Sequence, residues 1–234
     1  MKNFIHLRVD ETSQLLLFVT ILTCSVTAGS QRLPPSKYDG FPYRENGGGA
    51  CSSIIINAFF DPVCPDSRDS WPPLKQALDH YGSLVSLVVH LLPLPYHDNS
   101  FAVSRSLHIV DALNSSFTFP LLEQLFEHQE DFSNDQTKNM SKVDVINEIV
   151  EFVAGAIGNQ YYSYISSGFT NIGSNLKTRV SFKYSTSRGV YGTPMFFVNG
   201  FLLTDSSSTM SFNGWKTIID PLIEEEAAPG TWIA

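Results

Sequence analysis

The sequence predicts an α/β fold in which a long helical segment separates two parts of one sheet. An apolar run at 54–60, rich in β-branched and aromatic residues, predicts a buried strand that ends before Pro62. A second apolar run at 85–92 follows a helical pattern and so predicts a parallel partner strand. Residues 99–182 have a mostly helical pattern. Together these observations indicate one α/β domain with a helical insertion.

Composition fits a single globular domain and argues against several kinds of partner. The chain has 234 residues, of which 43% are hydrophobic and 16% charged, which suits one domain with room for an insertion. Its formal net charge is −8 and it has no basic stripe, so we expect no nucleic-acid partner. The six histidines lack metal-ligand spacing, so no metal site is expected. The neighbours His97 and Asp98 are expected to form a hydrogen-bonded loop rather than a catalytic dyad.

The first 28 residues have the pattern of a secretory signal peptide. Lys2 and Arg8 precede an apolar run at 15–22, which is the order found in such signals. Small residues at 26–28 predict cleavage after Ala28. We therefore expect a protein of the secretory pathway, extracellular or in an endomembrane lumen. The alternative is an uncleaved anchor, but the apolar run is shorter than the ~20 residues that span a bilayer. No membrane span is expected after cleavage.

The remaining chain divides into a leader, a domain and a tail. Residues 29–50 contain two consecutive prolines, three consecutive glycines and few apolar residues, which is typical of a flexible or extended leader. Residues 51–226 carry the strand and helix patterns, with the helical insertion at 99–182. Residues 227–234 are the C-terminal tail.

Cys64 stands where the first strand gives way to a helix. Pro65 suits the first helical position, because no backbone donor is needed there. Unpaired N–H groups at a helix start favour a thiolate, so this position suits thiol chemistry. The helix is expected to stop at Gly82, and the proline pair at 72–73 to kink or restart it.

The insertion is expected to contain several amphipathic helices. Patterns at 101–113 and from 172 to about 184 predict two of them. Ser141 is a good N-cap with Asp144 three residues on. The helix that follows has an apolar stripe for packing against the domain, formed by Val143, Ile146, Ile149, Val150, Val153 and Ile157.

Two N-glycosylation sequons, at Asn114 and Asn139, fall in parts of the insertion that we expect to be exposed. They fit a glycoprotein of the secretory pathway, although sequons also occur by chance.

The last part of the domain predicts a hairpin and a helix. Residues 195–199 predict a strand, the Asn199-Gly200 pair a tight turn, and 201–203 the partner strand. The final helix is expected to be interrupted at Pro221. The acidic run at 224–226 opposes the helix dipole, so the helix is expected to end early.

Two motifs resemble the thioredoxin superfamily in its DsbA-like branch. Cys64-Pro65-Asp66-Ser67 after a Phe-Phe strand resembles the family's active-site motif, and Gly192-Thr193-Pro194 resembles its cis-proline loop. The resemblance implies a thioredoxin fold with an inserted helical subdomain. It also implies a cis Thr193–Pro194 bond opposite Cys64, whose sulfur such motifs hold at the surface.

The resemblance also implies roles for single residues. Cys64 and Ser67 are the expected catalytic pair. The residues expected to contact a substrate are Pro65, Asp66, Thr193 and Pro194. Two departures concern the same chemistry: Ser67 replaces the family's second cysteine, and Ala58 replaces a buried acid that assists proton transfer at that cysteine. An active-site disulfide therefore cannot form within the motif, whereas Ser67 could donate a hydrogen bond to a Cys64 thiolate.

Three functions are left open by the sequence. The first is monothiol thiol–disulfide exchange or isomerisation, in which Cys64 forms mixed disulfides with cysteine-containing client proteins or peptides and needs no cofactor. The second is a redox-inactive binding module with the thioredoxin fold. The third is a glutathione-dependent transferase or isomerase, since enzymes with a DsbA-like fold use glutathione. The secretory signal argues against this third function.

Overall fold

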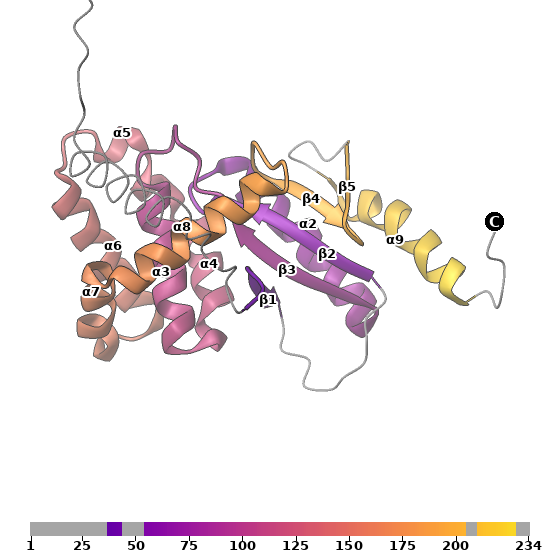
Figure 1. Ribbon diagram of the computed structural model, residues 1–234, viewed down its shortest axis with the longest axis horizontal. Helices are drawn as coiled ribbons and strands as arrows, with labels where there is room; N and C mark the ends of the chain where they lie inside the picture. Colours follow the sequence, from indigo (N-terminus) through magenta and orange to yellow (C-terminus); the bar gives the residue numbers. More distant parts are fainter. Residues whose placement is uncertain (1–36, 44–53, 205–209, 228–234) are drawn as a thin grey trace, which may run out of the picture. The chain divides into compact units, whose positions relative to one another are not determined.

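The computed structural model describes residues 37–43, 54–204 and 210–227 (Figure 1). The predicted signal peptide, most of the predicted leader, Cys51 and residues 228–234 lie outside the described residues. The chain from Asp39 onward forms one structural unit, which contains all the described strands and helices.

The described strands form one mixed sheet. They are β1 (Phe41–Tyr43), β2 (Ile54–Phe60), β3 (Val85–Leu91), β4 (Met195–Val198) and β5 (Phe201–Leu202), in the order β1-β3-β2-β4-β5. β2 and β3 are parallel, which confirms the strand–helix–strand prediction, and the other neighbouring strands are antiparallel. The predicted tight turn is also confirmed, because Asn199 and Gly200 both have positive φ, at 49° and 85°.

The described helices follow the predicted division of the chain. α2 (Pro65–Tyr81) connects β2 to β3. The insertion between β3 and β4 consists of α3 (Ser100–Leu113), α4 (Thr118–Glu127), α5 (Asn134–Thr137), α6 (Lys142–Ile157), α7 (Tyr162–Thr170) and α8 (Ile172–Ser187). The last described helix is α9 (Phe212–Ala227). The predicted helical insertion is confirmed, with α8 running beyond its expected end. No described helix is both long and apolar enough to cross a membrane.

α2 has the predicted ends and, of the two effects expected of its prolines, does not show the restart. Pro65 occupies its first turn, and Gly82, with φ 58°, terminates it. The helix passes through Pro72 and Pro73 without restarting. Each proline removes one backbone donor, and packing of the buried helix face offsets that loss. This face includes Trp71, Leu74, Ala77 and Leu78.

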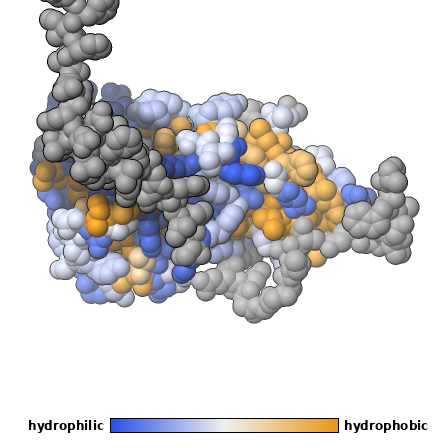
Figure 2. Space-filling model, in the orientation of Figure 1, coloured by the Kyte–Doolittle hydropathy of each residue, from blue (hydrophilic) through white to orange (hydrophobic). Residues whose placement is uncertain are grey.

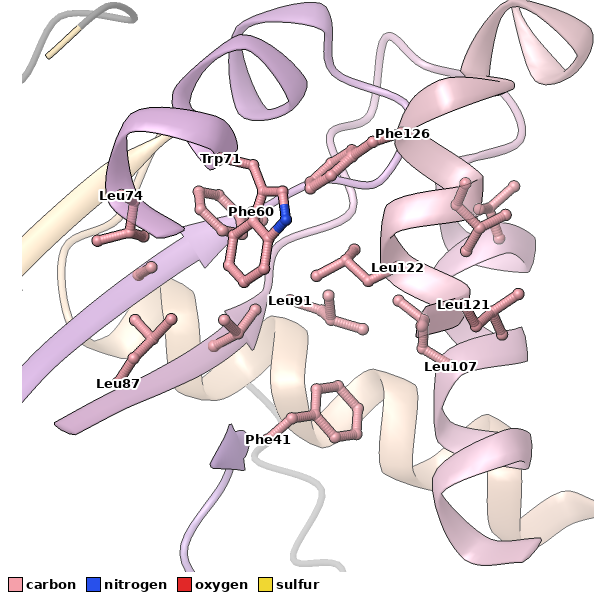
Figure 3. Close-up of a cluster of buried hydrophobic side chains, with 14 of the residues drawn as sticks. Phe41, Phe60, Trp71, Leu74, Leu87, Leu91, Leu107, Leu121, Leu122 and Phe126 are labelled. Atoms are coloured by element: carbon pink, nitrogen blue, oxygen red, sulfur yellow. The ribbon is translucent and has the colours of Figure 1, made fainter. Parts of the chain in front are cut away.

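The larger hydrophobic core lies between one face of the sheet, α2 and the insertion (Figure 3). Phe60 at the end of β2 lies beside Trp71 of α2, with ring centroids 6.2 Å apart. Leu91 of β3 points from the sheet towards the insertion, whose α3 and α4 contribute Leu107, Leu121, Leu122 and Phe126. Burial of each such side chain stabilises the fold by about 1.5–3 kcal/mol. This core therefore fixes the end of β2, immediately before Cys64.

Part of the opposite sheet face is covered by α8. Tyr184 stacks on His90 and Phe59, with ring centroids 4.8 and 6.4 Å away. Ser185 Oγ donates a 3.0 Å hydrogen bond to the Leu91 carbonyl at the end of β3. Figure 2 shows hydrophobic residues gathered over β2, β4 and β5, beyond the reach of this helix. α8 is thereby anchored at the sheet edge where β2 and β3 end.

α6 begins at the predicted cap, but its apolar stripe is shifted. Ser141 Oγ accepts a hydrogen bond from the Asp144 N–H, and the Asp144 carboxylate accepts one from the Ser141 N–H, each at 3.2 Å. Val143 is 66% exposed and Val145 is buried instead, so the stripe prediction is wrong at its first member. The members that are confirmed as buried are Ile149, Val150 and Val153.

The prediction of a flexible leader is wrong at 41–43, which form edge strand β1 antiparallel to β3. Phe41 is buried, and its ring centroid lies 5.0 Å from that of His108. Gly40 before it has φ 104°, and a Cβ there would lie 2.6 Å from Val88, so glycine allows the close approach to β3. Three residues are too few to give a recognisable strand pattern.

The predicted interruption and early end of the final helix are also wrong. α9 continues through Pro221 and the acidic run to Ala227, so the first residue of the predicted tail is helical. Trp215 and Ile219 are fully buried and hold the helix against the core. Tyr81 of α2 adds a 2.5 Å hydrogen bond from its hydroxyl to Asp220 Oδ1. Tertiary contacts therefore outweigh the local helix-breaking signals.

A chain of buried and half-buried polar side chains joins the β1 segment, the sheet and the insertion. Asp39 Oδ2 lies 3.1 Å from His90 Nδ1, and Asp39 Oδ1 accepts a 2.6 Å hydrogen bond from Ser181 Oγ. The chain continues from Ser181 Oγ to His108 Nε2, at 3.0 Å, and from His90 Nε2 to Asn57 Oδ1, at 3.0 Å. The carboxylate of Asp39 thus holds the residues just before β1 to α8 and β3.

Phe41→Ala tests whether β1 is a docked part of the fold. Removing a buried phenylalanine ring is expected to lower the free energy of unfolding by about 3–5 kcal/mol in urea denaturation. Pro42→Ala is the matched control, because Pro42 is exposed, and its effect should stay within about 0.5 kcal/mol. Equal effects of the two substitutions would contradict a docked β1.

His108 predicts a pH dependence of stability. Burial lowers the pKa of His108 from 6.5 to about 4, with Asp39 opposing the shift and Lys177 adding to it. Between these values the unfolded chain binds a proton that the folded chain does not. Stability is therefore complete above about pH 6.5 and falls by about 3 kcal/mol as the pH approaches 4. In His108→Gln this part of the pH dependence should vanish from urea unfolding curves; an unchanged dependence would contradict the assignment.

Candidate active site

Cys64 lies at the junction between β2 and α2, as the sequence predicted. It is the N-cap of α2 with extended backbone angles, φ −82° and ψ 121°, and its N–H donates a 3.0 Å hydrogen bond to the Asp61 carbonyl. The expectation of a sulfur at the surface is wrong, because Cys64 is only 5% exposed. Apolar side chains surround it: Phe59, Leu92, Leu94, Val190, Met195 and Phe197.

The loop before β4 lies against the sulfur, as expected. The Thr193–Pro194 bond is cis, and Cys64 Sγ lies 3.3 Å from the Thr193 carbonyl oxygen. A carbonyl oxygen only accepts, so this is a hydrogen bond from the thiol S–H. Pro194 is buried and Thr193 half-buried. Two motifs that are 129 residues apart in the sequence therefore form one site.

Ser67 is fully buried one turn into α2. Its Oγ accepts a 3.2 Å hydrogen bond from the Asp61 N–H, and its carbonyl accepts one from Ser70 Oγ at 2.8 Å. The hydrogen bonds of the described residues include none between Ser67 and Cys64, so the expected donation to the sulfur is not found there. In this arrangement the Ser67 hydroxyl stabilises the turn that carries Cys64.

Asp61 organises the site, and the sequence did not identify it. Its carboxylate is completely buried. Oδ1 accepts hydrogen bonds from the Val63 N–H (2.9 Å) and Ser100 Oγ (2.6 Å). Oδ2 accepts from the Leu94 N–H (3.0 Å) and from His97 Nδ1 (2.8 Å), which must carry the proton because a carboxylate only accepts. One side chain thus joins the turn before Cys64, the loop after β3 and the start of α3.

Two further residues of the site were missed by sequence reasoning. His97 lies in a hydrogen-bonded loop as expected, with its N–H donating to the Leu94 carbonyl, but the sequence did not show that its side chain bonds to Asp61, 36 residues away. Gln129 is buried, and its Nε2 lies 3.3 Å from the carbonyl oxygens of both Pro62 and Cys64. Neither contact can be recognised from neighbouring residues. The Asp61-Pro62 turn directly before the motif cysteine is the signal that could have drawn attention to Asp61.

The rim of the site is aromatic and acidic. Pro65 and Asp66 are exposed beside Cys64, and Tyr96, in the loop after β3, is 61% exposed. Partial desolvation of the Tyr96 hydroxyl raises its pKa from the ordinary value of 10, and the negative charges of Asp61 and Asp66 add to the shift. On the other side, Tyr191 next to the cis-proline loop is 86% exposed. Aromatic rings therefore stand in solvent near both motifs.

Ala58 stands where the resemblance implies a buried acid. It is fully buried in β2, opposite Val89 of β3 and Phe196 of β4, and belongs to the large apolar core. No carboxyl group can act from that position. The described residues contain no group of three or more His, Cys, Asp or Glu side chains arranged to hold a metal ion.

The two sequon asparagines, Asn114 and Asn139, are both exposed. Asn114 lies at the end of α3, where its Oδ1 accepts hydrogen bonds from the N–H and hydroxyl of Ser116. Both are far in sequence from the two site motifs. Glycosylation at these asparagines stays a prediction.

Asp61→Asn is expected to destabilise the protein and expose Cys64. In the wild-type protein four donors point at the Asp61 carboxylate, whereas the Asn amide would place its two N–H groups against some of these donors. Hydrogen bonds to a charged group contribute about 1.5–3 kcal/mol each. We expect the free energy of unfolding to fall by about 2–4 kcal/mol and Cys64 alkylation to become faster. Asp66→Asn, an exposed carboxylate in the same turn, is the control and should change stability by less than about 1 kcal/mol. Similar values for both variants would rule out the role given to Asp61.

Comparisons with known proteins give a fold but no sequence relative. No family model and no curated protein matches the sequence. Solved structures do match. A candidate protein-disulfide isomerase from Pseudomonas syringae is 18% identical, with a TM-score of 0.64, covering 77% of this chain and 98% of that chain. DsbA from Chlamydia trachomatis is 14% identical, with a TM-score of 0.60, covering 84% and 99%. The catalytic domain of ScsC from Proteus mirabilis is 15% identical, with a TM-score of 0.55, covering 81% and 92%. The chain therefore has the thioredoxin fold in its DsbA-like form, with a helical insertion.

Proposed function

We propose that the protein is a monothiol thiol–disulfide exchange protein that acts on cysteine-containing clients through Cys64. The observation that carries this proposal is the position of the Cys64 sulfur, at the start of α2 and 3.3 Å from the carbonyl of the cis Thr193–Pro194 bond. Oriented N–H groups at a helix start stabilise a thiolate, which is the nucleophile in disulfide exchange. Ser67 in place of a second thiol restricts the chemistry to one sulfur.

The proposed exchange has two steps, and each transfers one disulfide bond from one sulfur to another. The Cys64 thiolate attacks one sulfur of a client disulfide, which forms a Cys64–client disulfide and releases the other client sulfur as a thiolate that takes up a proton. A second client cysteine or an external thiol then attacks the client sulfur of the mixed disulfide and releases the Cys64 thiolate. When both thiols belong to one client, the result is isomerisation without net oxidation.

The surface around Cys64 suits an extended client segment. The backbone of Thr193 would pair with the client strand, as in β-strand addition, with Pro194 fixing the loop. Pro65 and Asp66 are exposed on the helix side and would contact the client there. The signal-like N-terminus and the exposed sequons support a location in the secretory pathway, where clients contain disulfides.

A redox-inactive binding module is the second candidate, and the burial of the sulfur favours it. Cys64 is 5% exposed, Ala58 supplies no acid, and the Ser67 hydroxyl is engaged with the Asp61 backbone. A glutathione-dependent enzyme has no comparable observation in its favour. The two leading candidates differ in one measurable property, which is whether Cys64 forms a disulfide with a client.

Trapping of mixed disulfides decides between them. The reduced protein is incubated with a scrambled disulfide-containing client, quenched with an alkylating agent and analysed by non-reducing gel and mass spectrometry. We expect adducts at Cys64 that are absent in Cys64→Ser, a control that retains Cys51. Ser67→Cys should shorten the adduct lifetime by about tenfold or more, because a thiol one turn away attacks intramolecularly. A folded protein without any Cys64 adduct would establish the binding module instead.

A further inference from the structure

A groove lies between the loop after β3 and α8. Its volume is about 430 Å³, within the range of sites that hold small ligands or single side chains. One wall is formed by residues of the 93–98 loop and by Phe101 of α3, and the other by Arg179, Phe182 and Lys183 of α8. Both walls are anchored: Asp61 holds the loop through the Leu94 N–H, and Ser185 holds α8 to β3.

The groove and the apolar cluster that contains Cys64 have one residue in common. Leu94 lines the groove and also packs in the apolar cluster around Cys64. His97 lines the groove as well and is bonded to Asp61, whose carbonyl accepts the Cys64 N–H. A client segment bonded to Cys64 would therefore have its neighbouring residues close to the groove.

The charges of the groove are unusual for this chain. Arg179 and Lys183 are exposed, one helical turn apart, and neither side chain makes a hydrogen bond or ion pair with another described residue. Asp98 is the acidic residue of the lining, so two fixed positive charges face one negative charge. The chain as a whole carries −8. Phe182 and the loop prolines supply apolar surface between these charges.

We infer that this groove binds an acidic side chain, Asp or Glu, located within a few residues of the client cysteine that reacts with Cys64. The inference rests on the proposed exchange function and adds a sequence preference to it. Arg179 and Lys183 provide the charge complementarity, and Phe182 packs on the aliphatic part of the acidic side chain. Such complementarity at a partly exposed site changes rates and preference more than overall affinity.

The test uses peptides whose single cysteine is activated as a 2-thiopyridyl disulfide and flanked by Glu, Gln or Lys. The Cys64 thiolate attacks the peptide sulfur, and pyridine-2-thiolate leaves and takes up a proton to give the thione, whose absorbance reports the rate. Each rate is divided by that of the same peptide with 2-mercaptoethanol, which removes differences in intrinsic reactivity. Cys64→Ser gives the background from other cysteines.

We expect the Glu peptide to react about 3- to 10-fold faster than the Gln peptide, and the Lys peptide more slowly. The advantage should shrink as the salt concentration rises from about 0.01 to 1 M. The double variant Arg179→Glu/Lys183→Glu should reverse the order of the peptides. Lys177→Glu is the matched control, since it makes the same change on an exposed residue of α8 that does not line the groove, and it should leave the order intact.

The possible outcomes distinguish failure of the acidic subsite in the groove from failure of disulfide exchange at Cys64. Equal normalised rates for all peptides, or an equal effect of Lys177→Glu, would refute the acidic subsite and leave exchange at Cys64 standing. Absence of any Cys64-dependent transfer would refute the exchange function and the subsite with it. If activated glutathione, but no peptide, depended on Arg179 and Lys183, the occupant would be a small acidic thiol and the peptide preference would be refuted.

Discussion

The buried carboxylate of Asp61 is the constraint on which the rest of the site depends. A fully buried charge is costly unless it is hydrogen-bonded, and this one accepts four hydrogen bonds from three separate segments. Its backbone adds two more: the Asp61 carbonyl accepts from the Cys64 N–H, and the Asp61 N–H donates to Ser67 Oγ. The start of α2, the loop after β3 and the start of α3 therefore cannot move independently, and the position of the sulfur follows from the position of this side chain.

The same network shows what stands in place of a second thiol beside Cys64. The Ser67 side chain occupies the place of a second sulfur, and its oxygen accepts from the Asp61 N–H. Ala58 fills its position with apolar contacts on β3 and β4. Both positions thus stabilise the fold around Cys64 instead of transferring protons, and within the described part of the chain the hydrogen bond of the sulfur goes to the Thr193 carbonyl. Deprotonation removes that contact, so a thiolate must rely on the N–H groups at the start of α2.

The parts of the fold that the sequence predicted are those with local signals. The strand before Cys64, Pro65 at the helix start, the Ser141 cap and the Asn199-Gly200 turn each depend on neighbouring residues. What was missed depends on distant ones. β1 is held by Phe41 packing and by Asp39, whose partner Ser181 is 142 residues away. Asp61 and His97 are 36 residues apart, and the continuity of α9 past Pro221 follows from its burial against α2. The periodic pattern of apolar residues along the sequence does not reveal contacts between residues so far apart.

Cys64 is buried in this structure, yet loop residues lie in the same apolar cluster, and this bears on how the sulfur could become accessible. Leu94, from the loop after β3, and Val190, from the segment before the cis-proline loop, belong to the apolar cluster that contains Cys64. Loops open at lower free-energy cost than packed helices. The Leu94 loop also forms one wall of the groove that carries Arg179 and Lys183 on its other side. If clients exchange disulfides at Cys64 as proposed, a side chain in the groove would contact the loop that carries Leu94, which Asp61 holds in place, so client recognition would be coupled to exposure of Cys64 through this loop.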